Sequence, residues 1–425
     1  MDGPTPSGDR PGRFGVLARL ALDTRPLRDS RDFRNLWIGQ ALSTTGTMIA
    51  SVAVPFQMYQ LTHSTFAVGM LGLAALVPLL VVPLVGGAIA DASDRRAVLI
   101  RTEIGLSAVA ALFLANAALP HPQVWALFAL ELLYTAVYSL GRPAMSSLTP
   151  RLVADDQIAA ASALQNVYWS LASVAGPAVG GILIATVGVP ATFGIDLLTY
   201  SASLVALWAL PRIPPAEDAI RLSVAAILEG FRYLRGRQAL MGVFGIDTIA
   251  MVFGMPTALF PAFAADLGGG ASTVGYLYAA PYAGAFLGTL VSGWTTHMRR
   301  QGLGVTIAAA AWGLAIAAVG LAQSLWLVLA MLAVAGGADF FSAVLRETML
   351  MRATPDAMRG RIVGIEFTQV AGAPNLGNIE AGVVASLTSV RTSIVSGGAI
   401  CVVGCILCAI ALPKFLHYDS RNPHE

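Results

Sequence analysis

Residues 66–119 read FAVGMLGLAALVPLLVVPLVGGAIADASDRRAVLIRTEIGLSAVAALFLANAAL. This stretch holds two apolar runs, 66–90 and 97–119, separated by a short charged gap that contains Arg95 and Arg96. Each run is long enough to cross the ~30 Å hydrocarbon core of a bilayer as a helix. Apolar runs joined by a short basic gap are typical of a protein that crosses the membrane repeatedly.

The same pattern fills the rest of the chain and predicts twelve spans. The composition agrees, because 56% hydrophobic residues, 12% charged residues and a mean hydropathy of +0.70 are far from the averages for soluble domains. We therefore expect an all-α membrane protein. The apolar runs lie at residues 36–61, 66–90, 97–119, 123–141, 157–187, 190–210, 240–265, 272–296, 303–322, 325–346, 361–388 and 392–413.

The positions of the basic residues predict the orientation. If the N-terminus is cytoplasmic, every one of the 26 Lys and Arg residues except Arg391 falls on the cytoplasmic side. Lys and Arg resist translocation, so this excess predicts that both termini are cytoplasmic. The basic gaps would lie against anionic lipid headgroups, so they need no nucleic-acid partner.

A polar interval from Pro211 to Gln238 divides the spans six and six. Within it, Leu222 to Leu234 has the pattern of an amphipathic helix on the inner membrane surface. The predicted units are a cytoplasmic tail (1–35), an N-terminal bundle (36–210), a linker (211–239), a C-terminal bundle (240–413) and a second cytoplasmic tail (414–425).

The two halves carry matching residues at a nearly constant separation. Arg142 and Arg346 are 204 positions apart, as are Gln165 and Gln369, and the Arg95-Arg96 pair recurs 204 positions later. A constant offset that equals six spans indicates an internal repeat. It predicts two pseudo-symmetric six-helix bundles that rock about a central site.

The charged gap resembles the loop signature of the major facilitator superfamily, although Ala92 replaces its usual basic residue and Asp94 its usual glycine. Small Gly87 would let helix ends approach, and an acidic side chain would pair with a helix N-terminus or an arginine. The resemblance implies a cytoplasmic gate. Asp94 has two open interpretations, a part of this gate or a solvated residue, and the two arginines of the repeat suit either gate ion pairs with Asp91 or Glu347 or attraction of an anionic ligand. The expected gate residues are Gly87, Asp91, Asp94, Arg95, Arg142 and Arg346.

A second motif, Gly176-Pro177-Ala178-Val179-Gly180-Gly181, lies in the fifth span. It resembles the glycine-proline signature of drug-type exporters of that superfamily, in which this element is associated with export. Proline removes a helix hydrogen bond and glycine permits close helix contact. The alternative interpretation is a packing motif without directional meaning.

Four further segments, 32–40, 53–65, 228–234 and 275–280, resemble the enterobactin exporter branch of bacterial efflux proteins. They are spread over both halves. The resemblance implies export of a catecholate-type siderophore, and because relatives in this branch also handle drugs, multidrug efflux is the alternative.

Carboxylates inside apolar spans are costly and are often functional. We expect proton coupling from the acids on the predicted lining helices or deep in a span, namely Asp247, Asp339, Glu131 and Glu380, although each could instead form a fixed ion pair. For Asp196 we favour a structural hydrogen bond. For Glu366 we favour capping or pairing near Arg359 and Arg361.

Amides, hydroxyls and aromatic rings suit a ring-bearing ligand. The candidates for the substrate cavity are Gln40, Ser43, Thr44, Gln165, Asn166, Trp169, Tyr282 and Gln369.

Other classes of function have weaker support. No phosphate-binding Gly-x-x-x-x-Gly-Lys-Ser/Thr loop occurs, so the chain carries no ATP drive. The histidines lie at loops or tails, and the cysteines share one face of the last span, so we expect no metal, no cofactor and no enzyme. The leading hypothesis is a monomeric, proton-coupled secondary exporter of the bacterial inner membrane that moves a small molecule by alternating access. Uptake, and a transporter-like sensor without flux, are further alternatives.

Overall fold

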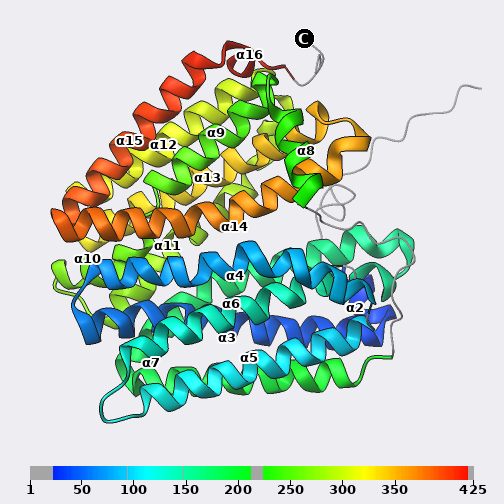
Figure 1. Cartoon of the computed structure of the whole chain (residues 1–425), viewed down its shortest axis with the longest axis vertical. Helices are drawn as coiled ribbons and strands as arrows, with labels where there is room; N and C mark the ends of the chain where they lie inside the picture. The colour runs from blue at the N-terminus through cyan, green and yellow to red at the C-terminus, as the bar shows by residue number, and fades with distance from the viewer. Residues whose placement is uncertain (1–22, 93, 147, 212–223, 420–425) are drawn as a thin grey trace, which may run out of the picture.

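The computed structural model describes residues 23–92, 94–146, 148–211 and 224–419, and it leaves the side chains of residues 83–92, 143, 146, 224–228 and 296 undescribed. The described residues are helical apart from loops and one isolated bridge between Arg300 and Asp419. Figure 1 shows two groups of long helices, the N-terminal half from blue to green and the C-terminal half from green to red.

The N-terminal half contains six membrane crossings, because α7 covers two of them. Its elements are α2 (Arg25–Asp29), α3 (Arg31–Thr62), α4 (Thr65–Ala92), α5 (Arg95–Ala117), α6 (Val124–Ser146), the 3-10 helices η1 (Thr149–Arg151) and η2 (Asp155–Gln157), and α7 (Ile158–Trp208).

The C-terminal half repeats this plan after the linker helix α8. Its elements are α8 (Val224–Leu234), α9 (Gln238–Phe253), η3 (Thr257–Leu259), α10 (Phe260–Asp266), α11 (Ala271–Leu290), η4 (Ser292–His297), α12 (Gln301–Leu321), α13 (Leu325–Ala353), α14 (Asp356–Leu387), α15 (Val390–Ala411) and α16 (Pro413–Leu416).

Local sequence explains where several helices begin and bend. Ser30 caps α3 by accepting a hydrogen bond from the Phe33 amide, and Asp94 caps α5 by accepting one from the Arg96 amide. Gly188 interrupts α7 with φ = 84°, two residues before Pro190. This left-handed conformation, which glycine adopts without steric cost, lets the chain turn back between the fifth and sixth crossings.

Two arginines cap helix C-termini. Arg96 donates to the carbonyls of Leu207 (3.0 Å) and Trp208 (2.7 Å) at the end of α7. Arg391 donates to the carbonyls of Gly320 (3.1 Å) and Ala322 (2.7 Å) at the end of α12. A guanidinium satisfies these otherwise unpaired carbonyls and complements the helix dipole. Arg391, the exception to the charge pattern, thus has a local structural partner.

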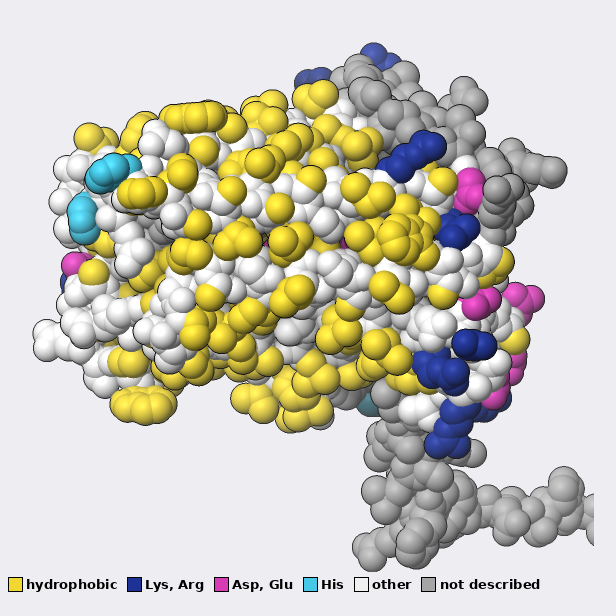
Figure 2. All heavy atoms as spheres, turned by 90° about the horizontal axis from the view of Figure 1, so that it is seen from below, with side chains coloured by type: hydrophobic (Ala, Val, Ile, Leu, Met, Phe, Trp, Pro, Cys, Tyr) yellow, Lys and Arg dark blue, Asp and Glu magenta, His cyan; other side chains and the backbone are white. Residues whose placement is uncertain are grey.

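The outer surface of the bundle is apolar. Large side chains such as those of Leu198, Trp326 and Ile410 are mostly exposed, as is expected of surfaces that face lipid. In Figure 2, hydrophobic side chains cover the middle of the visible face, whereas Lys and Arg gather at one end. We name the end that holds α2, α8 and α16 the terminal end, and the end that holds α10 the far end (Figure 1).

The two halves contact each other closely near the far end. Helix α4 packs on α14 where Gly69 faces Gly382, and α7 packs on α11 where Gly181 faces Gly275. A Cβ added at Gly181 would lie 2.5 Å from the Ala271 carbonyl oxygen and 2.8 Å from the Gly275 Cα. Only glycine permits this separation of the backbones, as in other close helix contacts within membranes.

The predicted fold class is confirmed. Length and composition alone identify eight membrane-spanning segments in the described residues, one of which, Asp155–Trp208, contains two crossings. Helices α3, α11 and α14, which hydropathy alone does not identify, complete the twelve.

Candidate functional site

A cavity of about 290 Å³ lies between the two halves, and it is larger than a second cavity of about 210 Å³ in the C-terminal half. Helices α3, α4, α5, α6 and α7 supply one side, and η3, α11 and α14 supply the other. Its apolar residues include Phe113 and Phe193, whose rings stack at 5.1 Å. The polar residues of the lining are Thr47, Ser51, Glu131, Tyr134, Asp196, Thr257, Tyr278, Asn375 and Asn378.

Asp196 and Glu131 bring carboxylates to this cavity from the N-terminal half. Asp196 is 4% exposed, and its Oδ1 atom has no hydrogen-bond partner, which differs from the structural hydrogen bond expected from the sequence. Gly46 leaves the room for it, since a Cβ there would lie 2.8 Å from Asp196 Oδ1 and would clash with Thr199. An unsatisfied buried carboxylate is costly, and in a cavity wall its natural partner is a ligand or a proton.

Hydrogen bonds beside Asp196 tie α3 to α5 and α7. Ser43 donates to Glu103 Oε1 (3.0 Å), Gln40 Nε2 donates to Ser203 Oγ (3.2 Å), and the Thr47 and Tyr200 hydroxyls are 3.0 Å apart. Glu103 is a functional candidate that sequence reasoning missed, although a carboxylate eight residues into an apolar helix was a signal that could have identified it.

The eight predicted cavity residues do not line the larger cavity. Three glutamines are instead satisfied within one half: besides Gln40, Gln165 Nε2 donates to Thr149 Oγ1 (2.7 Å), and Gln369 Nε2 donates to the Phe244 carbonyl and to Thr248 Oγ1, both at 2.8 Å. Thr44 is half-buried and Asn166 is exposed.

The structure does bring Trp169 and Tyr282 together. Their rings meet edge to face at 6.1 Å, and they belong to α7 and α11 in opposite halves. This pair therefore lies at the contact between the halves, where an opening motion would separate the rings.

A second cavity of about 210 Å³ lies in the C-terminal half. Arg346 Nη1 is 2.7 Å from Asp247 Oδ1, and Arg346 Nη2 is 3.8 Å from Asp339 Oδ1. The Asp247 and Arg346 side chains are 7% and 11% exposed. Although Asp247 Oδ1 is close enough for an ion pair, it makes no hydrogen bond of acceptable geometry. Two carboxylates thus share one guanidinium, and a single added proton would neutralise the cluster.

Other acidic candidates lie apart from this cluster or at its edge. Glu366 and Gln369 line the second cavity. The arginines expected near Glu366 have other partners: Arg359 pairs with Asp356 (2.8 Å), and Arg361 pairs with Glu229 of α8 (3.0 Å). Glu380 is half-buried on α14, toward the far end.

Two of the predicted gate residues, Arg142 and Arg346, have other neighbours than the acids expected for them. Arg346, expected to pair with Asp91 or Glu347, contacts Asp247 and Asp339 instead. Arg142 Nη1 donates to the Tyr138 hydroxyl (3.2 Å), and its guanidinium lies 5.8 Å from the ring of Phe367 in the other half. The surroundings of Gly87 and of the Asp91 side chain lie outside the described part of the structure, and Arg95 is the first residue of α5, next to its cap Asp94.

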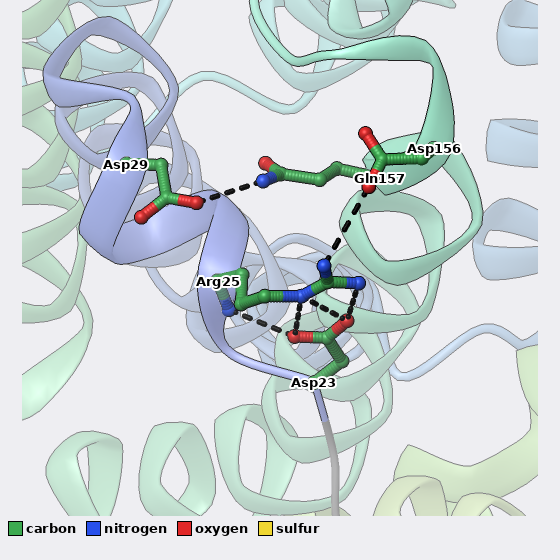
Figure 3. A network of polar contacts seen from close by, with 5 residues as sticks. All are labelled: Asp23, Arg25, Asp29, Asp156 and Gln157. Carbon is green, nitrogen blue, oxygen red and sulfur yellow. Dashed lines mark hydrogen bonds and ion pairs between the residues drawn. The ribbon is translucent and has the colours of Figure 1, made fainter.

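At the terminal end, a polar network holds α2 against η2 (Figure 3). Arg25 lies between Asp23 (2.8 Å) and Asp156 (3.5 Å), and Gln157 Nε2 donates to Asp29 Oδ2 (2.8 Å). The hydrogen bonds from Arg25 lower the pKa of Asp23 below its ordinary value. This network fixes the entry into α3 within the N-terminal half.

The glycine-proline motif of α7 uses its glycines on two sides. Gly176 and Gly180 lie against Met48 and Ile49 of α3, whereas Gly181 faces Gly275 of α11 in the other half. The motif therefore packs the fifth crossing on the first and also forms part of the contact between the halves.

Comparisons with known proteins agree with this architecture. The profile of a family described as transmembrane secretion effectors matches residues 23–424. The enterobactin exporters EntS of Escherichia coli strain K12 and Shigella boydii serotype 18 are 31% identical over 409 residues, which cover 95% of this chain and 97% of each relative.

Solved structures show the same fold at low sequence identity. The nucleoside transporter NupG has a TM-score of 0.74 at 14% identity and covers 90% of this chain and 99% of its own. A bacterial homologue of the lysosomal transporter Spinster, in an inward-facing and unoccupied conformation, has a TM-score of 0.73 at 14% identity and covers 93% and 98%. The resemblance inferred from the sequence motifs is confirmed: this chain belongs to the transmembrane secretion effector family of the major facilitator superfamily and is a multi-pass membrane transporter, not an enzyme.

Proposed function

We propose that the protein exports a catecholate-type siderophore, or a similar small molecule, from the bacterial cytoplasm across the inner membrane in exchange for protons. The cavity between the halves carries this proposal, because its tyrosines, amides and hydroxyls suit a ring-bearing ligand with many hydroxyl groups. The relatives named as enterobactin exporters support the substrate class.

The proposed orientation places the terminal end in the cytoplasm, as the basic residues suggest. The far end is then extracellular, and the glycine contacts there hold it closed. Such a state would load its ligand from the cytoplasm, and opening of the contacts of Gly181 and Gly69 would release the ligand outside. We expect the monomer, surrounded by lipid, to complete this cycle.

Proton coupling is assigned to Asp247 and Asp339, with Glu131 and Glu380 as further proton sites. An arginine shared by two acids leaves one uncompensated negative charge in a region of low dielectric constant, which favours uptake of one proton. Protonation would weaken the ion pair between Asp247 and Arg346 and so loosen the contact between α9 and α13. Binding of the proton would thereby be coupled to helix movement.

The gate is assigned to the terminal end, with Gly87, Asp91, Asp94, Arg95 and Arg142 as its members. Arg142 already reaches Phe367 across the halves. When the far end opens, the cytoplasmic ends of the halves must approach, and arginines would then find acidic partners. Arg346 is assigned to the proton cluster with Asp247 and Asp339. It would act on the gate indirectly, through movement of its helix α13.

Transport in inside-out membrane vesicles tests the proposal. An imposed proton gradient should drive accumulation of an iron-free tris-catechol siderophore, and a protonophore should abolish it. Flux that is unchanged by the protonophore would remove the antiport mechanism. Vesicles without the protein are the control.

Multidrug efflux is the second candidate, because two cavity carboxylates suit cationic drugs. Deletion of the gene in iron-starved cells separates the two functions. Siderophore retained inside the cells supports the first, whereas a loss of drug tolerance alone supports the second. A sensor would change neither.

A further inference from the structure

The larger cavity has an acidic wall that the proton cluster of the C-terminal half does not explain. Glu131 of α6 and Asp196 of α7 both line it, and none of the described residues that line it is Lys, Arg or His. Arg346, which pairs with Asp247 and Asp339, lines the separate second cavity. The two cavities therefore differ in whether an arginine faces the acids.

Asp196 is the residue that points to a ligand. It is more than nine-tenths buried, it lines the cavity, and its Oδ1 atom lacks a hydrogen bond within the protein. Ser43, on the adjacent turns of α3, is engaged by Glu103, and Thr47 is engaged by Tyr200. The polar neighbours of Asp196 thus satisfy one another. Oδ1 itself is buried against α3, so the carboxylate acts on a molecule in the cavity through its charge.

The opposite wall provides neutral polar groups. Asn375 and Asn378 come from α14, and Tyr278 comes from α11. The Asn378 side-chain oxygen already accepts hydrogen bonds from Thr257 Oγ1 (2.6 Å) and the Ala258 amide (3.0 Å). This wall is held in place, and it offers hydrogen bonds without charge.

Such a cavity distinguishes ligands by charge. If the two acids are ionised, they repel an anion and attract a cation or a hydroxyl donor. If they are protonated, they still form hydrogen bonds with phenols and amides, but they provide no positive charge to replace the lost hydration of an anion. In either protonation state, an anionic ligand is disfavoured.

We propose that Glu131 and Asp196 determine the charge of the ligand, so that the cavity accepts neutral or cationic molecules with hydroxyl and amide groups and rejects anions. This inference rests on the proposed function when it is applied to siderophores. Catechol groups keep their protons in the iron-free molecule and lose them when they bind Fe(III), which leaves the metal complex negatively charged. The acidic wall would therefore select the iron-free form.

Binding to the purified full-length protein in lipid nanodiscs tests the inference, with tryptophan fluorescence as the readout. The probes are an iron-free tris-catechol siderophore and its gallium(III) complex, which has the charge of the ferric complex without its redox chemistry. We expect the gallium complex to bind at least about tenfold more weakly, which corresponds to about 1.4 kcal/mol. Equal binding of the two forms would overturn the inference and leave the proposed function intact.

The variants Glu131→Gln and Asp196→Asn assign the effect to these residues. Each should reduce the difference between the two probes by about threefold or more. Asp266→Asn is the matched control, because Asp266 is exposed on α10 and does not line the cavity. If both variants fold and still distinguish the two probes as well as the wild-type protein does, the assignment of the effect to Glu131 and Asp196 is wrong. Because the wild-type comparison uses no variant, a variant that fails to fold leaves the inference testable.

A second probe pair separates this inference from the proposed function. If no siderophore form binds and none is transported, the proposed function fails. The charge preference is then measured with an aromatic ammonium ion and a sulfonate of the same ring system. Preference for the ammonium ion that is lost in Glu131→Gln and Asp196→Asn supports the acidic wall, and equal binding of the two ions refutes it.

Discussion

At the scale of single residues, the environment of an acid decides its role more than its type does. Asp247 and Asp339 share the guanidinium of Arg346, whereas none of the described residues that line the cavity beside Asp196 is Lys, Arg or His. All three are aspartates within membrane-spanning helices. The first two suit a proton-dependent ion pair, and the third suits an electrostatic effect on a molecule in the cavity.

Asp247→Asn should uncouple transport from protons. The amide keeps the volume of the side chain but cannot be protonated or carry the charge that holds Arg346. We expect proton-driven flux to fall by about tenfold or more, while exchange without a gradient continues. Flux in proteoliposomes with and without a pH gradient measures this. Asp266→Asn is the control, and wild-type coupling in Asp247→Asn would exclude this site.

Arg391→Gln should destabilise the protein without a direct effect on transport. The change removes the guanidinium that bonds the end of α12 and lies 5.3 Å from the Phe263 ring. We expect a loss of about 1–2 kcal/mol, as for other partly buried caps and charged hydrogen bonds. Arg359→Gln breaks only an exposed pair within α14 and should cost less than about 0.5 kcal/mol. Thermal unfolding in detergent compares the two, and equal effects would contradict the role of the cap.

At the scale of helices, α7 and α11 approach each other closely near the far end, and we propose that this contact holds the far end closed. Gly181 and Gly275 face each other with no room for a Cβ. The same α7 motif packs on α3 through Gly176 and Gly180. This arrangement links a packing function to a conformational one, because contacts within a half persist while contacts between the halves must open.

Gly181→Ala and Gly275→Ala should therefore shift the protein toward states with an open far end. The added methyl group has to push the helices apart, and overpacking of this kind costs about 1–3 kcal/mol. Spin labels on Ser64 and Asp266, each replaced by cysteine, would report a larger mean separation by pulsed electron resonance. Gly194→Ala, where no atom lies within 4 Å of the added Cβ, should leave the separation unchanged. Identical distances in all variants would refute the role of this contact.

At the scale of the whole molecule, the charge pattern predicts which end faces the cytoplasm. His121 is exposed in the loop before α6 at the far end, and Lys414 is exposed on α16 at the terminal end. In a variant whose three native cysteines are replaced by alanine, His121→Cys should react with an impermeant thiol reagent added to intact spheroplasts. Lys414→Cys should react only after the membrane is broken. The reverse pattern would overturn the proposed orientation.

The pattern of residues along the chain was enough to predict the twelve crossings, the two halves and the family. Backbone groups in lipid must be satisfied within the helix, so most crossings are long apolar runs in the sequence, and the turn signals at Gly188 and Pro190 are equally local. The roles of the predicted site residues could not be predicted in the same way, because neighbours in space decide whether a glutamine such as Gln40 faces a ligand or another residue.

Which polar residues meet became visible in the packed helices. Arg346 joins Asp247 from a different helix, Gly181 meets Gly275 across the halves, and Asp196 faces a cavity whose other wall comes from α14. Hydropathy is a property of each local stretch of sequence. Contacts between these side chains depend instead on the crossing angles and rotations of helices that are far apart in the chain. That is why the fold follows from the pattern of the sequence while the partners of its charged residues do not.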